Sequence, residues 1–371
     1  MLELIIIIAI ILYSARAIVF YVGAYLERKS SNIIDENLAL PFLSIVVPAR
    51  NEEQNIANCL ESLLLSNYSV DNFEIIVVND RSEDNTQNIV EKYIKEHKNI
   101  KLINVTEVRE HRNLRGKPGA LDIGIKNAQA EYVLMTDADC KVHPNWIKNI
   151  AMTFIQNKSD FIASYTLIRE SRSLFEHLQE VEWLFMHTMA AGGLGLNQPL
   201  GCFGNNTAIR KEAYMQIGTY ENIPFSVTED LALLQTLTKN NFKANYICNP
   251  NATVKTEPCH TVSEYIEQHH RWTVGGKGLG WRASVFVTTS VSLWLGILLA
   301  SIFDLHLWII PLLLTRIIGD LLVIYPVLNR LKLNHLKNSI VLSILLVFVL
   351  ELLTPLYLLK KNVVWKGQIF R

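Results

Sequence analysis

Two aspartates, Asp137 and Asp139, follow the apolar run 132–136 with a single alanine between them. In an extended chain, residues two apart point to the same side, so both carboxylates can face one ion. Hard oxygen ligands at this spacing suit Mg²⁺ or Mn²⁺, above all where phosphate groups complete the coordination. The alternative is a polar turn in which the aspartates cap the next helix, and two aspartates alone favour that turn.

A second acidic motif, Thr228-Glu-Asp230, precedes leucines that recur at helical spacing. Thr228 is predicted to cap the amino end of that helix, because its side-chain oxygen can accept a backbone N–H and the helix dipole favours acids in the first turn. Asp230 is also a candidate general base, which would take a proton from a hydroxyl group as that hydroxyl attacks. Capping alone is sufficient to explain the motif, so both interpretations stay open.

Basic and aromatic side chains supply groups that can hold phosphates. Gln268, Arg271 and Trp272 fall on one face of a predicted helix through their i, i+3 and i+4 spacing. Such a face can bind a diphosphate and shelter a second substrate, although arginine and tryptophan before an apolar segment are also expected as membrane-interface anchors. Lys117, in the predicted loop Gly116–Gly119, can neutralise phosphate, or it is simply solvated.

These residues need a scaffold, and the sequence predicts one of alternating strands and helices. Apolar, β-branched runs are followed by polar loops and then by helical periodicity, which indicates a parallel, doubly wound sheet. In such a sheet, ligands bind outside the carboxyl ends of the strands. The predicted strands are residues 43–48, 73–80, 100–105 and 132–136. Polar residues at three of these ends predict one cleft: Arg50 to Glu52, Asp80, and Asp137 with Asp139.

The composition places this charged segment between two apolar ones. Residues 4–26 are apolar enough to cross a bilayer, residues 284–359 are again mostly apolar, and residues 40–280 hold most of the charge. Arg28 and Lys29 follow the first run, which predicts an uncleaved anchor with the next domain in the cytosol. Basic and acidic side chains number 35 each and no basic tract occurs, so nucleic acid is not expected as a partner.

Two further sequence features exclude other classes of protein. No Gly-x-Gly-x-x-Gly follows the first predicted strand, which argues against a dinucleotide-binding domain. The five cysteines are odd in number and include no close pair with metal-ligand spacing, so neither a disulfide framework nor a zinc site is expected. A reducing compartment fits this pattern.

The C-terminal apolar part is predicted to hold spans at residues 284–303 and 305–328, joined by a turn at Asp304–His306. Residues 338–359 are a third span or a re-entrant segment. The re-entrant alternative is preferred because it keeps the basic tail in the cytosol.

Arg316 and Asp320 lie four residues apart inside the second of these spans. Charged groups there are costly and commonly face a protein interior or a functional cavity. We interpret the two residues as an internal neutralising pair that holds helices together. The alternative is that they contact an amphiphilic acceptor.

Seven short motifs follow one another along the chain, and their order is more specific than any one of them. They resemble, in sequence and spacing, the membrane-associated family-two glycosyltransferases over roughly residues 40–280. The motifs are Pro48-Ala-Arg-Asn-Glu52, Val78-Asn-Asp80 with Ser82 and Asp84, Gly116-Lys-Pro-Gly-Ala-Leu121, Asp137-Ala-Asp139, Gly204-Asn-Asn206, Thr228-Glu-Asp230 and Gln268-His-His-Arg-Trp272.

The resemblance implies an α/β fold of the GT-A type, doubly wound and nucleotide-sugar-binding, with N- and C-terminal transmembrane helices. It also implies a nucleotide-sugar donor such as a UDP-sugar, a divalent metal, Mg²⁺ or Mn²⁺, and inversion at the anomeric carbon by direct displacement. The small number of C-terminal segments predicts limited addition, of one sugar to a lipid, glycolipid or polyprenyl-linked acceptor.

Residues on the donor side follow from the resemblance, position by position. Arg50 and Glu52 would line the nucleotide pocket, and Asp80 would contact the base. Lys117 and Asp137 would lie near the donor sugar or ribose and its phosphates.

The remaining assignments concern the reaction itself. Asp139 would bind the metal, and Asp230 would be the catalytic base. Gln268, Arg271 and Trp272 would hold the diphosphate and close the acceptor site.

The chain departs from the family pattern beside the donor base. Asn79-Asp80 stands where the family usually has paired aspartates, and Arg81 replaces the glycine that commonly follows them. Arg50 stands where many members place an aromatic residue against the base. These positions bear on which base the donor carries.

The predicted organisation has four parts. They are an anchor at residues 1–30, a cytosolic GT-A domain at 40–282 with an interfacial helix at 261–274, a membrane bundle at 284–360, and a tail at 361–371. This arrangement predicts an integral protein of a bacterial-type plasma membrane. The alternative functions are a small polysaccharide synthase and a catalytically silent membrane scaffold that binds a nucleotide sugar.

Overall fold

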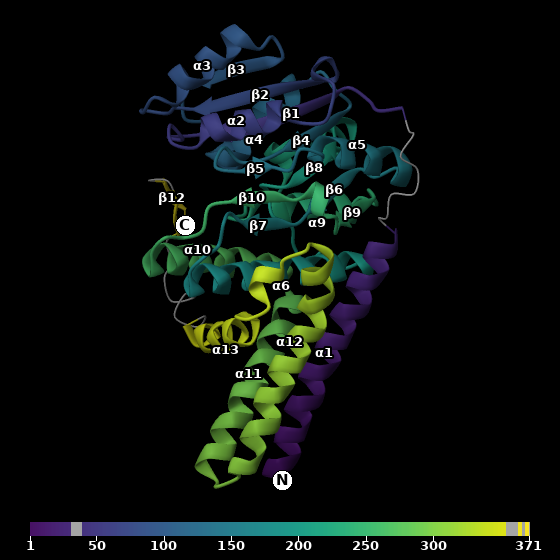
Figure 1. Cartoon of the computed structure of the whole chain (residues 1–371), viewed down its shortest axis with the longest axis vertical. Coiled ribbons are helices and arrows are strands. Elements are labelled where there is room, and N and C mark those ends of the chain that lie inside the picture. Colours follow the sequence, from purple (N-terminus) through teal and green to yellow (C-terminus); the bar gives the residue numbers. More distant parts are fainter. Residues whose placement is uncertain (31–38, 354–362, 366–367, 371) are drawn as a thin grey trace. The chain divides into compact units, whose positions relative to one another are not determined.

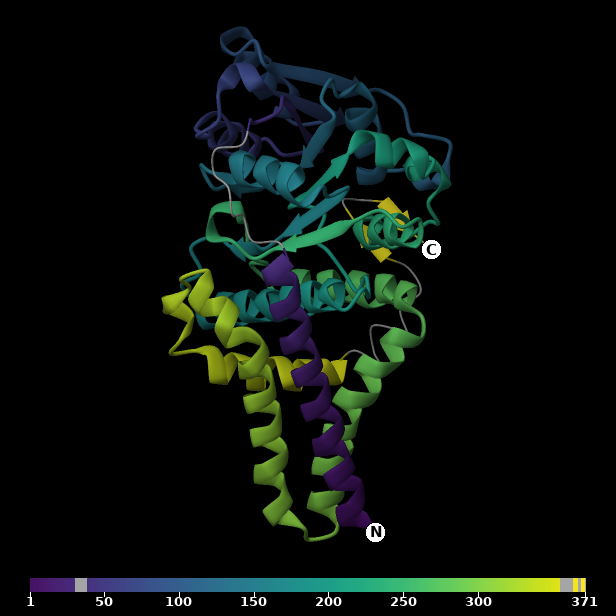
Figure 2. The same cartoon turned by 90° about the vertical axis from the view of Figure 1, so that its right-hand side faces the viewer.

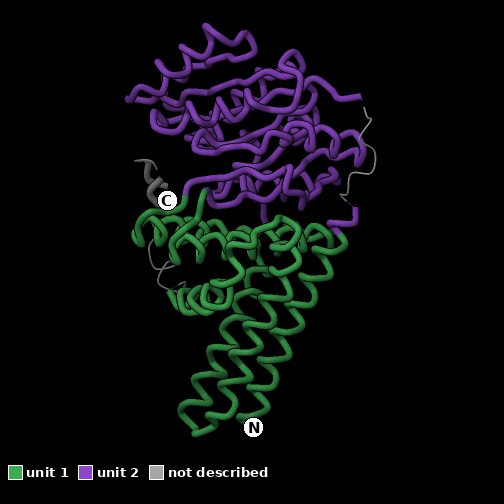
Figure 3. The backbone as a smooth tube through the Cα atoms, in the orientation of Figure 1, with its two compact units in different colours: residues 1–26, 170–200, 258–371 green, residues 27–169, 201–257 purple. Residues whose placement is uncertain are grey.

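The structure is a computed structural model that describes residues 1–30, 39–353, 363–365 and 368–370. The chain packs into two compact units, which Figure 3 distinguishes by colour. Unit 1 comprises residues 1–26, 170–200 and 258–371, and unit 2 comprises residues 27–169 and 201–257. Each unit is therefore assembled from separate stretches of sequence.

Unit 2 contains a seven-stranded sheet with helices packed on it (Figure 1). Strands β1 to β4 are mutually parallel, β8 is antiparallel to both β4 and β6, and β9 is parallel to β6. In spatial order the strands are β3 (Ile100–Val105), β2 (Phe73–Asp80), β1 (Leu43–Ala49), β4 (Tyr132–Met135), β8 (Thr207–Arg210), β6 (Phe161–Ser164) and β9 (Ala244–Ile247).

The four strands expected from the sequence are confirmed and are parallel. Because β1 and β2 are covered on both faces, they are buried along nearly their whole length and read as continuous apolar runs. The sheet is nevertheless mixed, so the expectation of a wholly parallel sheet is wrong beyond β4. Strands β6, β8 and β9 have only four residues each, too few for a periodic signal.

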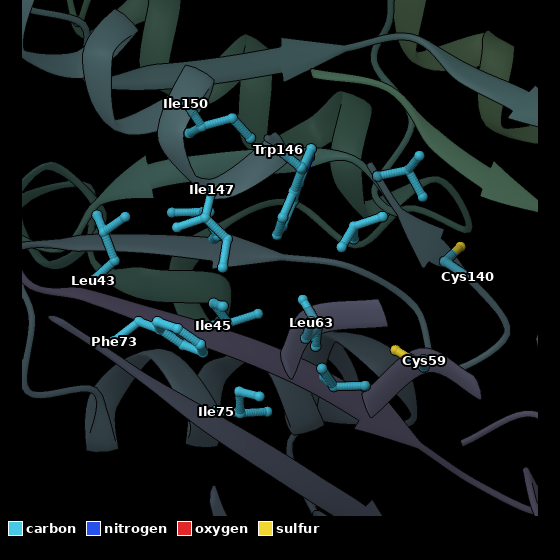
Figure 4. Packing of buried hydrophobic residues seen from close by; sticks show 14 of the residues in the cluster. Leu43, Ile45, Cys59, Leu63, Phe73, Ile75, Cys140, Trp146, Ile147 and Ile150 are labelled. Atoms are coloured by element: carbon cyan, nitrogen blue, oxygen red, sulfur yellow. The ribbon is translucent and has the colours of Figure 1, made fainter. Parts of the chain in front are cut away.

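Helices of unit 2 bury their apolar faces against the sheet. Figure 4 shows side chains of β1, β2, α2 and α5 in one cluster, with Trp146 of α5 fully buried. On α4, a methyl group added to Gly124 would lie 2.3 Å from Val46 Cγ1, so this helix approaches β1 too closely for any side chain. The helices are α2 (Ile56–Leu64), α3 (Thr86–Glu96), α4 (Lys117–Asn127), α5 (Trp146–Asn157), α7 (Lys211–Gln216), α8 (Thr219–Asn222) and α9 (Glu229–Lys239).

A second, three-stranded sheet in unit 2 has the order β5-β10-β7. Strand β10 (Val254–Thr256) pairs in antiparallel fashion with β5 (Lys141–Val142) and in parallel with β7 (Thr166–Ile168). The small sheet thus joins the segment that follows β4 to two segments far away in the sequence.

Unit 1 is mainly helical. Three helices are long and apolar enough to cross a membrane: Leu2–Ser30, Trp281–Ile302 and His306–Arg330. They correspond to α1 (Leu2–Ser30), α11 (Trp281–Ile302) and α12 (Ile309–Arg330), and Figure 2 shows them side by side. The other elements are α6 (Leu174–Gly195), α10 (Val262–Gly275), α13 (Ile340–Leu350) and the hairpin of β11 (Val363–Trp365) with β12 (Gln368–Phe370).

The last apolar segment does not continue this arrangement. The apolar helix at Ile340–Leu353, which includes α13, is about 21 Å long at 1.5 Å per residue, less than the ~30 Å of a hydrocarbon core. Figures 1 and 2 show α13 lying across the direction of α11 and α12. Of the span expected at 338–359, residues 354–359 lie outside the described part, as do residues 361–362, 366–367 and 371 of the expected tail.

The charged residues inside the apolar helices neutralise one another. Arg316 is 1% exposed and donates to Asp320 Oδ2 at 2.7 Å and to Glu351 Oε1 at 2.8 Å. The Tyr13 hydroxyl donates to the other oxygen of Asp320, which ties α1 to α12. The interpretation of Arg316 and Asp320 as an internal neutralising pair is therefore confirmed.

Two segments belong to a different packing unit from the one that the predicted domain ranges imply. Both α6, which lies within 40–282, and α10, expected as the interfacial helix 261–274, belong to unit 1 with the apolar helices. The units describe packing and not function, so the domain ranges stay a prediction.

Candidate active site

The order of strands in the large sheet marks where a ligand is expected. From β1 the chain moves outward to β2 and β3, then returns to the other side of β1 as β4. In open α/β sheets, ligands bind at the carboxyl ends of the strands where the order reverses in this way. Arg50 and Glu52 follow β1, Asp137 and Asp139 follow β4, and Asp80 ends the neighbouring β2.

The loops that follow β1 and β2 are fastened to each other. Asn51 and Glu53 each donate a backbone N–H to the second loop and each accept a backbone N–H through the side chain. These four bonds are Asn51 N to Ser82 Oγ at 2.9 Å, Glu83 N to Asn51 Oδ1 at 2.9 Å, Glu53 N to Asp84 Oδ2 at 3.0 Å, and Asn85 N to Glu53 Oε2 at 3.0 Å. Arg50 and the buried Glu52 therefore sit on a braced loop.

Asp80 is held by the residue that follows it. Arg81 donates Nε to Asp80 Oδ1 at 2.8 Å and Nη2 to Asp80 Oδ2 at 3.1 Å. Arg81 has a φ of 56°, in the left-handed region where glycine is at ease and other residues are strained. The backbone at this turn thus adopts a conformation that favours glycine, while the Arg81 side chain occupies both oxygens of Asp80.

Lys117 lies in the first turn of α4 and not in a solvated loop. Gly116 precedes the helix with a φ of 71°, and Pro118 fits the first turn, where its missing N–H costs no hydrogen bond. Lys117 is 13% exposed, and its Nζ lies 2.6 Å from Asp137 Oδ1 and 3.7 Å from Glu229 Oε1. Burial lowers the pKa of Lys117, but the combined effect of these carboxylates is larger, so the pKa of Lys117 is raised. The expectation of a solvated loop lysine is wrong.

Asp230 lies beside Lys117, in the first turn of α9. Its Oδ2 accepts the Gly204 N–H at 2.7 Å, and its Oδ1 accepts the Leu231 N–H at 2.8 Å. Burial, together with repulsion from Glu229, raises the pKa of Asp230 to about 6 despite the opposing effect of Lys117. A carboxylate with such a pKa is ionised near neutrality and is a stronger base than an ordinary aspartate.

Thr228 precedes α9 as expected but does not cap it through its side chain. Its hydroxyl instead lies 3.0 Å from the Ser226 hydroxyl. The expected Thr228 side-chain cap is therefore wrong, because a nearer hydroxyl competes for the oxygen.

The Gly204-Asn-Asn206 motif lies next to Asp230 and contributes to its hydrogen bonding. Asn206 accepts from Trp146 Nε1 at 2.8 Å and donates to the backbone oxygens of Tyr165 and Ala252. Because the Asn206 amide is bonded on both sides within the core, the backbone at Gly204 is fixed where its N–H meets Asp230. The motif contributes a positioned backbone donor.

Asp139 lies two residues before β5, one strand of the three-stranded sheet. The Cys140 thiol lies 3.3 Å from its Oδ1, and its backbone oxygen accepts from Arg169 Nη2 at 2.9 Å. Burial and the nearby aspartates raise the pKa of the Cys140 thiol, so it is a neutral donor. Among the described residues, no group of three or more His, Cys, Asp and Glu side chains is arranged to enclose a metal ion.

The last three predicted residues belong to α10 of unit 1. A capping box of Thr261 and Glu264 starts this helix. Within unit 1, the Trp272 ring packs edge-on against Trp183, with ring centres 5.6 Å apart. The Gln268 Oε1 atom is buried and has no hydrogen bond to any residue that the structure describes.

Comparison with known proteins decides the family. The profile of Glycosyl transferase family 2 matches residues 44–218, and that of Glycosyl transferase family group 2 matches residues 132–357, more than half of the chain. The chain belongs to glycosyltransferase family 2. The predicted resemblance is therefore confirmed, and so is the GT-A fold.

Two curated relatives of this glycosyltransferase chain have named products. The Beta-monoglucosyldiacylglycerol synthase of Trichormus variabilis is 26% identical over 64% of this chain and 49% of its own length. The Poly-beta-1,6-N-acetyl-D-glucosamine synthase of Staphylococcus epidermidis is 27% identical over 69% of this chain and 60% of its own length. The match thus spans only half to three fifths of these relatives.

One solved structure resembles the family-2 chain along almost its whole length. The mannosyltransferase PcManGT from Pyrobaculum calidifontis, in complex with GDP-Man and Mn²⁺, has a TM-score of 0.62 and covers 95% of this chain and 99% of its own. At 16% identity, this likeness shows the fold.

Within the glycosyltransferase chain, the structure places the predicted residues in four groups. Lys117, Asp137 and Asp230 share one cluster, while Arg50 and Glu52 occupy the braced loop after β1 and Asp80 ends the neighbouring β2. Asp139 lies two residues from Asp137, and Gln268, Arg271 and Trp272 are carried by unit 1.

Three residues at this site were missed. Glu229 is adjacent to Asp230, so its position in the motif was a usable signal. Arg169 and Glu257 have no local sequence signal, because only the register of the small sheet brings them to Asp139.

The turn at Arg81 yields a test of backbone strain. Arg81→Gly and Arg81→Ala both remove the guanidinium, but only alanine keeps the strain of a φ of 56°. We expect the glycine variant to be the more stable of the two by about 1 kcal/mol in chemical unfolding of the purified protein.

Arg115, at a φ of −83°, is the matched control, and there the glycine variant should be the less stable. Equal stability of the two Arg81 variants would contradict the assignment of strain to this turn.

Proposed function

We propose that this chain is an inverting, metal-dependent glycosyltransferase that moves a sugar from a nucleotide-sugar donor to a hydroxyl of a lipid or polyprenyl-linked acceptor. The observation that carries the proposal is Asp230. It is a carboxylate with a pKa near 6, held by two backbone N–H groups beside the buried Lys117. A protein that only binds a nucleotide sugar has no need of a base at this position.

In the proposed reaction, the acceptor oxygen attacks the anomeric carbon from the side opposite the diphosphate. The new C–O bond forms as the bond to the diphosphate oxygen breaks, and the nucleoside diphosphate leaves with that electron pair. Asp230 takes the hydroxyl proton, so the oxygen does not develop a full positive charge. Direct displacement inverts the anomeric carbon, and the names of both curated relatives specify β linkages.

The net negative charge of the carboxylates around Lys117 supports the binding of a divalent cation. Asp137, Glu229 and Asp230 provide three carboxylates against the single ammonium of Lys117, and Asp139 follows two residues after Asp137. A donor diphosphate adds further negative charge, which such a site repels unless a cation accompanies it.

The donor set also fits Mg²⁺ or Mn²⁺. These ions are commonly held by one or two carboxylates plus substrate phosphates, which requires no three-ligand cage. Asp139 would hold the ion, and when bound it would neutralise the departing diphosphate. The solved structure of similar fold, PcManGT, is a complex with GDP-Man and Mn²⁺.

On the donor side, Lys117 and Asp137 act as one unit. Their ion pair would present one cation toward the phosphates and hold the Asp137 carboxylate in place for the ribose or sugar. Arg50, Glu52 and Asp80 would line the base. The donor is proposed to be a UDP-sugar, and the Asp80–Arg81 pair is the feature most able to alter that preference.

Gln268, Arg271 and Trp272 are proposed to bind the diphosphate and close the acceptor site. The buried Gln268 oxygen, unsatisfied within the described chain, supports a polar ligand there. Arg271 would add positive charge to the leaving group in the transition state.

A lipid acceptor is supported by the diacylglycerol-linked product in the name of one relative and by three helices able to cross a membrane. The second candidate is a small polysaccharide synthase, which the name of the other relative favours. Product length separates the two, because a polymerase gives a ladder of products and a single-addition enzyme gives one.

The charges on the apolar helices support a cytosolic catalytic domain in a bacterial-type plasma membrane. Trp308 Nε1 lies 3.5 Å from Glu3, so the amino end of α1 and the turn between α11 and α12 share one end of the bundle. That end carries no Lys or Arg in residues 1–15 and 303–315. The basic residues collect at the opposite helix ends, which the positive-inside tendency places in the cytosol: Arg28, Lys29, Lys277, Arg282, Arg330, Lys332 and Lys337.

The pH dependence of the reaction tests the role of Asp230. The base must be ionised, so kcat/KM should fall as the pH drops through about 6. Glu229→Gln removes a neighbouring negative charge and should move this acid limb to lower pH. Asp230→Asn should lower turnover roughly 10²- to 10⁴-fold while the donor still binds.

Glu221→Gln, an exposed acidic residue of α8, is the control and should leave the limb unchanged. Full activity of Asp230→Asn would refute the catalytic assignment and favour the silent scaffold.

Membrane orientation can be tested by labelling single cysteines in intact cells. Cys259 is the most accessible natural cysteine and the other four are buried, so Cys259→Ser gives a background with little maleimide labelling. We expect an impermeant maleimide to label His306→Cys from outside and Lys337→Cys only after permeabilisation. The reverse pattern would contradict a cytosolic catalytic domain.

A further inference from the structure

The register of the three-stranded sheet aligns three residues that are far apart in sequence. Val254 of β10 pairs with Val142 of β5 in antiparallel fashion and with Thr166 of β7 in parallel. At one end of this sheet, Asp139 comes two residues before β5, while Arg169 directly follows β7 and Glu257 directly follows β10. The candidate metal ligand is thus the first member of a row across the end of this sheet.

Arg169 spans that row with its guanidinium. Its Nη2 donates to the backbone oxygen of Asp139 at 2.9 Å, and its Nη1 forms an ion pair with Glu257 Oε1. Its own backbone N–H donates to the Thr256 oxygen at 2.8 Å, which anchors the base of the side chain. The guanidinium is thus held by two partners and the backbone of Arg169 by a third, and the Arg169 side chain is 14% exposed.

Arg169 affects the geometry of Asp139 more than it affects the net charge beside Asp139. Glu257 neutralises Arg169, so the two together add no net charge beside Asp139. A planar guanidinium can donate to a carbonyl and a carboxylate at fixed angles, which a lysine ammonium does not reproduce. The direction of the Asp139 carboxylate follows from its backbone, and a misplacement of about 1 Å at a metal or catalytic group is costly.

We propose that Arg169 and Glu257 are positioning residues that hold the backbone of Asp139 so that its carboxylate faces the metal and the donor diphosphate. This proposal rests on the metal-dependent function argued above. The chain also leaves unit 2 directly after each of these two residues. The clamp therefore fixes the metal-ligand loop to the points where the chain enters unit 1.

Direct Mn²⁺ binding tests the clamp independently of turnover. The purified full-length protein is titrated with Mn²⁺, alone and with UDP, and free Mn²⁺ is followed by electron paramagnetic resonance. We expect Arg169→Gln to raise the Mn²⁺ Kd about tenfold or more, as loss of a residue that orients a metal ligand commonly does. Arg169→Lys should not restore binding. Glu257→Gln should weaken binding in the same direction, and the double variant should be no worse than Arg169→Gln alone.

Arg210→Gln is the matched control. It breaks another guanidinium–carboxylate pair of unit 2, Arg210 with Asp160 at 2.6 Å, with 23% of the arginine side chain exposed. It should lower the melting temperature as Arg169→Gln does but leave the Mn²⁺ Kd unchanged.

The outcomes separate the two proposals. If the unsubstituted protein binds Mn²⁺ and Arg169→Gln binds it equally well, the clamp is refuted and the metal site stands. If the unsubstituted protein binds no Mn²⁺ with or without UDP, the metal-dependent function is refuted and the clamp falls with it.

Discussion

Repulsion between carboxylates is the constraint on which the carboxyl end of the large sheet depends. Asp137, Glu229 and Asp230 gather there around Lys117, and repulsion from Glu229 adds to burial in raising the pKa of Asp230. Lys117 offsets this repulsion because its ammonium group contacts the carboxylates of Asp137 and Glu229. The helix that carries Lys117 starts within the Gly116-Lys-Pro-Gly119 motif, so local backbone chemistry places the cation.

The rest of the site follows from this balance. Asp137 is paired directly with the compensating cation, whereas burial and the neighbouring Glu229 keep the pKa of Asp230 raised, which suits a base. The Gly204 N–H stabilises the Asp230 carboxylate without adding a formal charge, and Asn206 holds that backbone in the core. The excess negative charge that remains is the physical reason to expect a divalent cation together with the donor diphosphate.

The sequence predicted the parts of this arrangement that depend on local patterns. The four parallel strands, the strand-end positions of Asp80 and Asp137, and the helix at 261–274 all follow from periodicity and turn chemistry. The alternative of a solvated Lys117 was wrong, and no local pattern could exclude it because the partners of Lys117 lie 20 and 112 positions later in the chain. The short strands β6, β8 and β9 and the row of Asp139, Glu257 and Arg169 depend on pairing between distant segments, which a single sequence does not display.

The site is proposed to turn over a nucleotide sugar with the help of a divalent metal. The most direct measurement is donor consumption by the purified full-length protein in detergent across UDP-, GDP- and dTDP-sugars, with Mn²⁺, with Mg²⁺ and with chelator. We expect hydrolysis or transfer with one class of donor, UDP-sugars first, that is lost when the metal is removed. Failure with every donor, with and without metal, would contradict the proposed function.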